Sequence, residues 1–143
     1  MNRPRVCFAA AEFAPLAAVG GLAEATSGLV RELARVGDVE VDLVLPDYGD
    51  VELDAERRTT LDVPPWVGEA TRRRGHHPGA GPVSLIGVPG LAREHPYVDP
   101  RGLPWPDNEA RFLAFSAAVA AHVVDTGPDL VHLNDWHTAA VSA

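Results

Sequence analysis

Residues 5–46 read RVCFAAAEFAPLAAVGGLAEATSGLVRELARVGDVEVDLVLP, and the order of apolar and turn-forming residues in this stretch predicts the fold. The short apolar run from Arg5 to Ala11 is typical of a strand that is buried on both faces. The alternating run from Val39 to Pro46 predicts a second strand. Between them, apolar residues recur at helical spacing and Gly37 provides a stop, which predicts a helix from Leu22 to Val36. The helical stripe consists of Leu22, Ala25, Leu29, Leu33 and Val36. A strand, a helix and a strand in about forty residues form a βαβ unit, which requires parallel strands with a right-handed crossover.

The rest of the chain continues the alternation of strands and helices. Residues 83–88 (VSLIGV) and 129–133 (DLVHL) are predicted strands. A helix is predicted from Glu109 to Asp125, with Asp107 or Asn108 as its N-cap. Its apolar stripe consists of Phe112, Phe115, Val119 and Val123. This order predicts an α/β domain with a Rossmann-like parallel sheet, in which ligands bind at the carboxyl ends of the strands.

Two segments between these elements contain many turn-forming residues. Residues 47–82 are interpreted as a variable, loop-rich insert with weak strand propensity from Leu61 to Val67. Within the insert, RRRGHHPGAGP (Arg72 to Pro82) could bind an anion, but nothing apolar positions it, so we interpret it as a solvated, mobile loop. Residues 91–108 are rich in Pro and Gly and are expected to form an ordered excursion between a strand and a helix.

Composition limits the classes of function. The chain has 143 residues, of which 46% are hydrophobic, and this is enough for a single domain spanning residues 1–143. A formal net charge of −8 argues against nucleic acid or an anionic membrane surface as a partner. The first residues imitate a secretory signal, but Glu12 interrupts the apolar run too early. Cys7 is the only cysteine, which excludes an intramolecular disulfide and favours the cytoplasm.

Gly20 and Gly21 lie directly before the first predicted helix, at the expected ligand edge of the sheet. Free backbone N–H groups and the positive end of a helix would favour a phosphate there. A tight turn explains the glycine pair equally well, because the pattern matches neither a P-loop nor a dinucleotide fingerprint. The pair therefore needs a second feature before it indicates a binding site.

That second feature is HLNDWHT, residues 132–138, at the end of a later predicted strand. Asp135 could accept hydrogen bonds from sugar hydroxyls, with Trp136 as an aromatic wall and a histidine nearby, although core packing explains Trp136 equally well. His132 and His137 do not predict a metal site, because no cysteine partner or H-E-x-x-H pattern accompanies them. A Ser-His-Asp hydrolase is also unsupported, since the chain lacks a G-x-S-x-G motif.

Three ordered motifs resemble bacterial glycogen synthases and plant starch synthases, the retaining glycosyltransferases of family 5. They are RVCFAAAEFAPLAAVGGLAEATSGLVRELARVG…VEVDLVLPDYG, HPYVD…WPDNEARFLAFSAAV and PDLVHLNDWHTAAV. The resemblance covers nearly the whole chain except residues 47–82. The resemblance implies part of the N-terminal domain of a two-domain GT-B enzyme. Such enzymes transfer glucose from ADP-glucose to the non-reducing end of an α-1,4-glucan without a metal or other cofactor.

The resemblance also implies roles for individual residues. Gly20 and Gly21 would lie against the diphosphate of the donor, and Asp135 would act in the sugar pocket as the catalytic residue of this chain. Further substrate-binding residues implied in the same way are Ala18, Glu24, Tyr97, Asp107, Asn108, Asn134, Trp136 and His137. Tyr97 and the Asp107–Asn108 pair would shape the rim of the pocket.

The chain departs from the family's glycine motif Lys-x-Gly-Gly-Leu-Ala-Asp at two positions. Ala18 stands at the position of the Lys, and Glu24 stands at the position of the Asp. The chain contains no lysine and no arginine between Arg5 and Arg31, so no neighbouring residue replaces the lost cation. Losing one charge-assisted phosphate contact costs about 1.5–3 kcal/mol.

Two hypotheses about the polypeptide therefore remain. In the first, it is an incomplete piece of an active synthase, inactive alone, whose partners are a nucleotide sugar, an α-glucan and a missing C-terminal GT-B domain. In the second, it is a non-catalytic domain that binds glucan or protein. Because the family's N-terminal domain continues with further βα units, we also expect apolar surface where those units would pack, and hence self-association or poor solubility.

Overall fold

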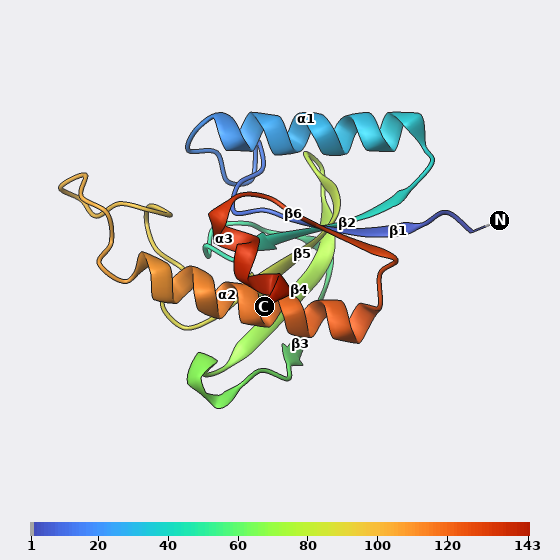
Figure 1. The fold of residues 1–143 in the computed structure, drawn as a ribbon. Helices are drawn as coiled ribbons and strands as arrows, with labels where there is room; N and C mark the ends of the chain where they lie inside the picture. The colour runs from blue at the N-terminus through green and yellow to red at the C-terminus, as the bar shows by residue number, and fades with distance from the viewer. Residues whose placement is uncertain (1) are drawn as a thin grey trace.

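The computed structural model describes residues 2–143, which form one mixed sheet between two long helices (Figure 1). The strands are β1 (Arg5–Ala9), β2 (Glu40–Pro46), β3 (Asp54–Leu61), β4 (Ala70–His77), β5 (Gly81–Gly87) and β6 (Leu130–Leu133). The helices are α1 (Gly21–Val36), α2 (Asn108–Thr126) and the short α3 (Trp136–Ala139), with 3₁₀ turns η1 (Pro65–Val67) and η2 (Ala140–Ser142). Across the sheet of residues 2–143, the strand order is β3-β4-β5-β2-β1-β6.

The parallel part of the sheet is the part that the sequence predicts. β1 pairs in parallel with both β2 and β6, and β2 pairs in parallel with β5. Phe8 of β1 lies opposite Leu43 of β2 on one side and His132 of β6 on the other. Because α1 connects β1 to β2, the predicted βαβ unit is confirmed.

The interpretation of Arg72 to Pro82 as a solvated loop is wrong. The segment lies largely in β4, which pairs antiparallel with β3 and with β5, while η1 occupies part of the stretch 61–67. Arg73 of β4 is buried, because its guanidinium donates to Asp47 at 2.8 Å and to Glu56 at 2.6 Å. Buried charges are tolerated when they are paired. The partners come from other parts of the chain, so the local sequence carries no sign of them.

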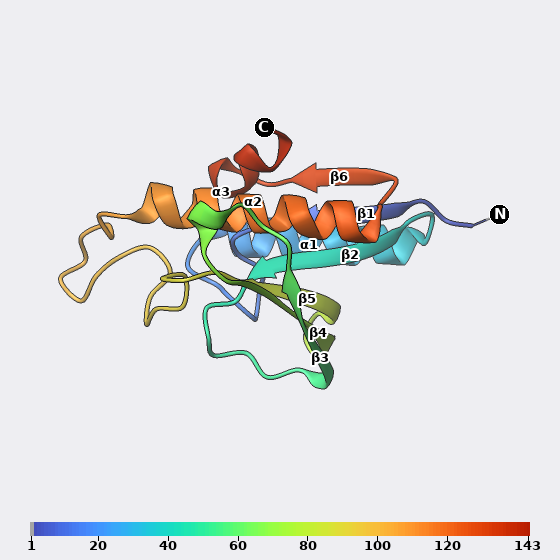
Figure 2. The same cartoon turned by 90° about the horizontal axis from the view of Figure 1, so that it is seen from below.

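The two long helices cover opposite faces of the sheet, and Figure 2 shows α2 crossing in front with α1 behind. β1 separates two apolar clusters. Cys7 and Ala9 pack in the cluster on the α2 side, whereas Phe8 and Ala10 pack with Val30 on the α1 side. Burial, together with the charge of Asp42, raises the pKa of the Cys7 thiol to about 12. The prediction of a doubly buried first strand is confirmed.

The predicted apolar stripe of α1 is wrong. Leu29 and Val36 are 41% and 53% exposed, and the buried residues of this helix are Ala23, Thr26, Ser27 and Val30. Small side chains let the helix lie close to the sheet. The Thr26 hydroxyl can be buried because it donates to the carbonyl of Glu12 at 2.7 Å. Hydrogen-bonded hydroxyl groups thus take the place that the sequence pattern assigned to leucines.

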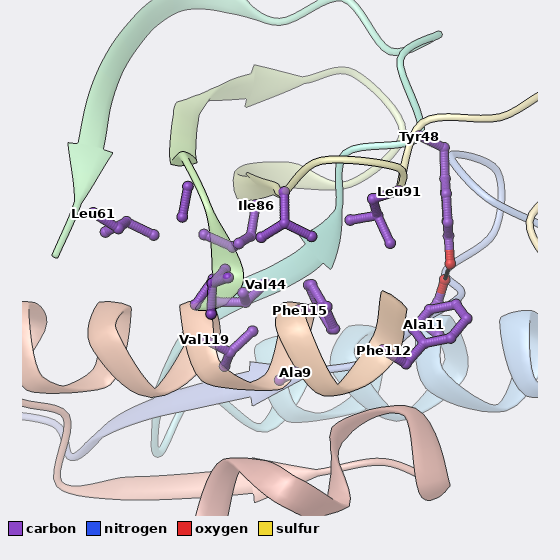
Figure 3. Close-up of a cluster of buried hydrophobic side chains, with 14 of the residues drawn as sticks. Ala9, Ala11, Val44, Tyr48, Leu61, Ile86, Leu91, Phe112, Phe115 and Val119 are labelled. Carbon is purple, nitrogen blue, oxygen red and sulfur yellow. Dashed lines mark hydrogen bonds between the residues drawn. The ribbon is translucent and has the colours of Figure 1, made fainter. Parts of the chain in front are cut away.

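The predicted stripe of α2 is confirmed. Phe112, Phe115 and Val119 are at most 2% exposed and, in Figure 3, lie on the side of α2 that faces Val44 and Ile86. The helix ends at Gly127, whose positive φ of 55° allows its N–H to bond to the carbonyl of Val123. No helix within residues 2–143 has the length and apolar character needed to cross a bilayer.

Candidate functional site

The predicted site residues follow strands that end at the same edge of the sheet. β1 ends at Ala9 and its parallel neighbour β6 ends at Leu133. Asn134, the next residue after β6, donates from its backbone N–H and from its Nδ2 to the carbonyl of Ala9, at 3.1 and 2.8 Å. This contact fastens the start of the 134–137 loop to the start of the loop that leads to the glycine pair.

Glu12 is a central residue of this edge, although the sequence pattern marked it only as the end of an apolar run. Its side chain is buried, and its Oε2 accepts hydrogen bonds from the N–H groups of Val19 at 3.2 Å and Gly20 at 3.1 Å. Gly20 is the N-cap residue of α1 and offers no side chain for capping. The carboxylate of Glu12 therefore satisfies donors near a helix N-terminus, where negative charge is favoured. A carboxylate placed directly after a buried strand is the signal that could have revealed it.

Neither Gly20 nor Gly21 is required by its own backbone. Gly20 is extended, with φ of −152° and ψ of −158°, and Gly21 lies in the helix outside the positive-φ region. A Cβ added at either position would meet no atom within 4 Å. The explanation as a tight turn therefore loses its support, and the pair leaves open space beside the N-terminus of α1. Within residues 2–143, the N–H groups of Gly21 and Leu22 have no acceptor.

Tyr97 connects two loops. One is the loop before α1 that contains Gly20 and Gly21, here called the glycine loop, and the other is the loop after β6, residues 134–137. Its hydroxyl donates to Glu12 Oε1 at 2.8 Å, and its ring stacks on the ring of His137 with centroids 5.2 Å apart. Burial raises the pKa of the Tyr97 hydroxyl, and the neighbouring Tyr48 and Glu12 raise it further. Its backbone carbonyl accepts hydrogen bonds from the side chain of Asn108 at 2.9 Å and from the N–H of Trp105 at 3.0 Å.

The loop after β6 holds Asp135 in an unusual conformation. The backbone of Asp135 has φ of 64° and ψ of −178°, a region that residues other than glycine rarely occupy. Its exposed carboxylate accepts a hydrogen bond from the N–H of Trp136 at 2.6 Å. Such strain persists where the surrounding structure enforces it, and it is concentrated at functional sites.

Trp136 and His137 provide aromatic surface beside this carboxylate. Trp136 is 51% exposed, and its ring stacks on that of His137 at 4.0 Å. His137 is buried, also contacts Phe112, and has an Nδ1 atom without a hydrogen-bond partner within residues 2–143. Burial lowers the pKa of His137, although the carboxylates of Asp135 and Glu12 oppose this shift. The imidazole is therefore held neutral.

The structure does not bring every predicted site residue into this cluster. Ala18 and Glu24 are exposed, without side-chain hydrogen bonds in the described part of the chain. Asp107 forms a two-pronged ion pair with Arg93 at 2.6 and 2.7 Å, which lowers its pKa. His132 stacks on Phe8 and contacts Asn134, so it does not lie with His137. Among residues 2–143, no group of three or more His, Cys, Asp or Glu side chains could hold a metal ion.

The family profile described as "Starch synthase catalytic domain" matches residues 5–143. The chain belongs to this starch synthase family. The predicted resemblance and the predicted α/β fold are both confirmed, because a solved structure of the family has the same fold. That structure is the catalytic domain of starch synthase IV from Arabidopsis thaliana bound to ADP and acarbose. It matches 99% of this chain and 30% of its own with a TM-score of 0.76 and 30% identity.

Curated members of the starch synthase family are similar along nearly all of this chain. A glycogen synthase from Paramagnetospirillum magneticum is 38% identical over 97% of the chain. Another, from Halorhodospira halophila, is 42% identical over 94% of the chain. In both comparisons the aligned region is 30% of the relative's own length. The chain therefore corresponds to about a third of a glycogen synthase.

Proposed function

We propose that this chain is the N-terminal, acceptor-side part of a cytoplasmic GT-B glucosyltransferase that transfers glucose from ADP-glucose to an α-1,4-glucan. The observation that carries the proposal is the position of Tyr97. Its hydroxyl bonds to Glu12, which holds the glycine loop, and its ring stacks on His137 in the loop after β6. Parallel α/β sheets bind ligands at this edge, and the family relationship gives the ligand class.

The glycine loop would receive the diphosphate of the donor. The open space beside Gly20 and Gly21 allows a ligand to approach the backbone, and the N–H groups of Gly21 and Leu22 could donate to phosphate oxygens. The N–H of Gly20 already donates to Glu12, so Gly20 would contribute only the open space beside its backbone. The starch synthase IV structure that resembles this chain is bound to ADP, which supports a nucleotide as the ligand.

The loop after β6 would receive the transferred glucose. The strained, exposed Asp135 can accept hydrogen bonds from hydroxyl groups, and the exposed face of Trp136 can contact the apolar face of a sugar ring. His137 and Tyr97 would fix the position of Trp136 and the wall of the pocket. Asp107 and Asn108 would shape the rim of the pocket indirectly. Asp107 would do so by holding Arg93, and Asn108 by its hydrogen bond to the carbonyl of Tyr97.

A titration of ADP into the chain and two variants tests the proposal. Ala18→Lys would place an ammonium group on the exposed loop before Gly20, so ADP should bind about tenfold more tightly, and the gain should shrink with added salt. Ala17→Lys is the matched control, because Ala17 is half-buried and pairs with Phe13 through its backbone. Calorimetry measures the affinity of each of the three proteins for ADP, ADP-glucose and UDP. Equally weak binding of ADP by all three proteins would refute the proposed diphosphate site.

Ala18 favours a second candidate function, a non-catalytic domain that binds glucan or protein. No Lys or Arg lies near the glycine loop in the sequence to neutralise a departing ADP. The exposed apolar side chains of Trp66, Leu113 and Val124 would suit a protein partner, including a second copy of the chain. The two functions differ in one measurement: ADP-[14C]glucose and glycogen, incubated with this chain and a synthase C-terminal domain, should yield labelled glycogen only if the chain serves catalysis.

A further inference from the structure

Residues 88–107 carry Tyr97 but contain no helix and no strand of the sheet. The segment leaves the end of β5 and, in Figure 1, extends as a yellow-to-orange excursion beyond the N-terminal end of α2. It has few backbone–backbone hydrogen bonds, such as that from the N–H of Asp99 to the carbonyl of Leu103, and side-chain bonds supplement them, such as that from the N–H of Tyr97 to His95 Nδ1 at 3.1 Å. Segments with few backbone bonds open locally at low free energy. Contacts with the rest of the protein should therefore help to hold Tyr97 in place.

Arg111, on the first turn of α2, provides that hold. Its side chain donates to the carbonyls of Gly90 at 2.9 Å, Leu91 at 2.8 Å and Pro96 at 2.9 Å. Its Nη1 donates in addition to Asn108 Oδ1 at 2.8 Å. A guanidinium has five N–H donors in a fixed planar arrangement, so one side chain can bind several carbonyls of an irregular loop. No other residue type offers this set of donors.

The burial of Arg111 is unusual because the charge has no ionic partner. The residue is 3% exposed, and within residues 2–143 no carboxylate lies within 4 Å of its guanidinium. Burial lowers the pKa of Arg111 and the nearby Arg93 lowers it further, although the more distant carboxylate of Asp107 opposes this shift. A buried charge is costly unless it is fully hydrogen-bonded. Its four bonds to loop carbonyls and Asn108 thus both solvate the cation and fix the loop.

Asn108 extends this contact to Tyr97 itself. Its Oδ1 accepts from Arg111, and its Nδ2 donates to the carbonyl of Tyr97 at 2.9 Å. The side-chain hydroxyl of Tyr97 then reaches Glu12, whose other oxygen holds the N–H of Gly20. A continuous series of hydrogen bonds runs from Arg111 through Asn108 and Tyr97 to the glycine loop.

We propose that Arg111 is a positioning residue that clamps residues 90–97 against α2 and so fixes Tyr97 at the rim of the sugar pocket. The part that concerns the sugar rests on the proposed function. Arg111 contacts no residue of the glycine loop directly. Its loss should therefore affect binding of the sugar more than binding of the nucleotide.

Arg73 is a matched control because it is a second buried arginine with several hydrogen bonds. It is 8% exposed and bonds to Asp47 after β2, to the carbonyl of Val51 in the β2–β3 loop and to Glu56 in β3. Arg73→Met and Arg111→Met remove the same side chain from two buried sites. Arg111→Lys keeps the charge and some of the donors, and serves as the rescue variant.

The first measurement is amide hydrogen exchange on the 143-residue chain. Arg111→Met should speed exchange of the N–H groups of Asp99, Trp105 and Asn108 about tenfold relative to the amides of β1 and β2, and Arg111→Lys should restore part of the protection. Arg73→Met should leave the exchange rates of these three N–H groups, each taken as a ratio to the rates in β1 and β2, unchanged. Unchanged ratios in Arg111→Met, or the same increase in Arg73→Met, would overturn the clamp.

The second measurement is calorimetric titration of ADP and ADP-glucose. Arg111→Met should weaken binding of ADP-glucose about tenfold and that of ADP less than about twofold, with partial recovery in Arg111→Lys. Equal weakening for both ligands, or none, would overturn the sugar-positioning role. If the unmodified chain binds neither ligand, the proposed function fails and the sugar role with it, while the exchange measurement still decides whether Arg111 clamps the loop.

Discussion

Glu12 joins three segments that lie far apart in the sequence. It follows β1 and accepts hydrogen bonds from the N–H groups of Val19 and Gly20. It also accepts a hydrogen bond from the hydroxyl of Tyr97, which lies 85 positions later in the chain. Hydrogen bonds to an ionised group are stronger than those between neutral groups. Because the carboxylate is buried, each donor that it loses leaves a charge that water cannot easily solvate. The site depends on this residue although it would not touch the transferred sugar in the proposed function.

Tyr97→Phe tests that dependence. The substitution removes one donor from the buried carboxylate of Glu12 and should lower the free energy of unfolding by about 1.5–3 kcal/mol. Tyr48→Phe is the control, since its hydroxyl donates at 2.9 Å to the neutral carbonyl of Ala11, a pair that Figure 3 shows end to end. That loss should be about 0.5–1.5 kcal/mol. Urea unfolding measures both, and a smaller loss for Tyr97→Phe than for Tyr48→Phe would contradict the role of Glu12.

At the scale of whole elements, the sequence pattern missed the antiparallel strands β3 and β4 and assigned the wrong buried face to α1. α1 packs through Ala23, Thr26 and Ser27 instead of its leucines, so its buried face is set by close approach to the sheet. β4 is the central strand of the antiparallel part and contains Gly75 near its C-terminal end. A Cβ at Gly75 would lie 2.7 Å from the carbonyl oxygen of Asp54 and 2.9 Å from Leu53. Glycine is therefore required there by space.

Two glycine substitutions should act in opposite directions. Gly75→Ala should destabilise the protein by about 1–3 kcal/mol, because backbone and side chain must shift to admit the methyl group. Gly28→Ala in α1 should stabilise it by about 0.5–1 kcal/mol, since alanine favours the helix and its Cβ would meet no atom within 4 Å. Thermal and urea unfolding of both variants measure the changes. Tolerance of alanine at position 75 would show that β3 and β4 pair differently.

For the whole molecule, acid stability depends on how the sheet edge buries its polar groups. His137 is enclosed by Tyr97, Phe112 and Trp136, and this burial lowers its pKa. The unfolded chain binds a proton at this residue near pH 6.5, whereas the folded chain resists it. Between the lowered pKa of His137 in the folded chain and its value of about 6.5 in the unfolded chain, the unfolded state binds more protons. The free energy of unfolding therefore falls as the pH falls through this range.

The free energy of unfolding should therefore be nearly constant between about pH 7 and 8 and decline on acidification below about pH 6.5. His137→Phe keeps a flat ring in the aromatic cluster and should remove this first decline. A second decline below about pH 4 should remain in the variant, because Arg93 holds the pKa of Asp107 below its usual value and Arg101 does the same for Asp99. Denaturant titrations from about pH 2 to 8 measure both. An unchanged first decline in His137→Phe would assign it to other groups.

The sequence by itself determined the elements whose residues repeat locally. The apolar run of β1, the alternation in β2 and the stripe Phe112, Phe115 and Val119 are each contained within one element, so periodicity predicts them. The family's motifs also identified the sheet edge that carries Gly20 and Asp135, because parallel strands end together.

Only the tertiary structure decided which polar groups are buried. Arg73, Arg111 and Glu12 are charged, and a charge is read from sequence as exposed unless its partners are known. Those partners are Asp47 and Glu56 for Arg73, loop carbonyls for Arg111, and Tyr97 with the glycine loop for Glu12. The free energy of burying a charge depends on hydrogen bonds to residues distant in the chain, and local periodicity contains no information about them.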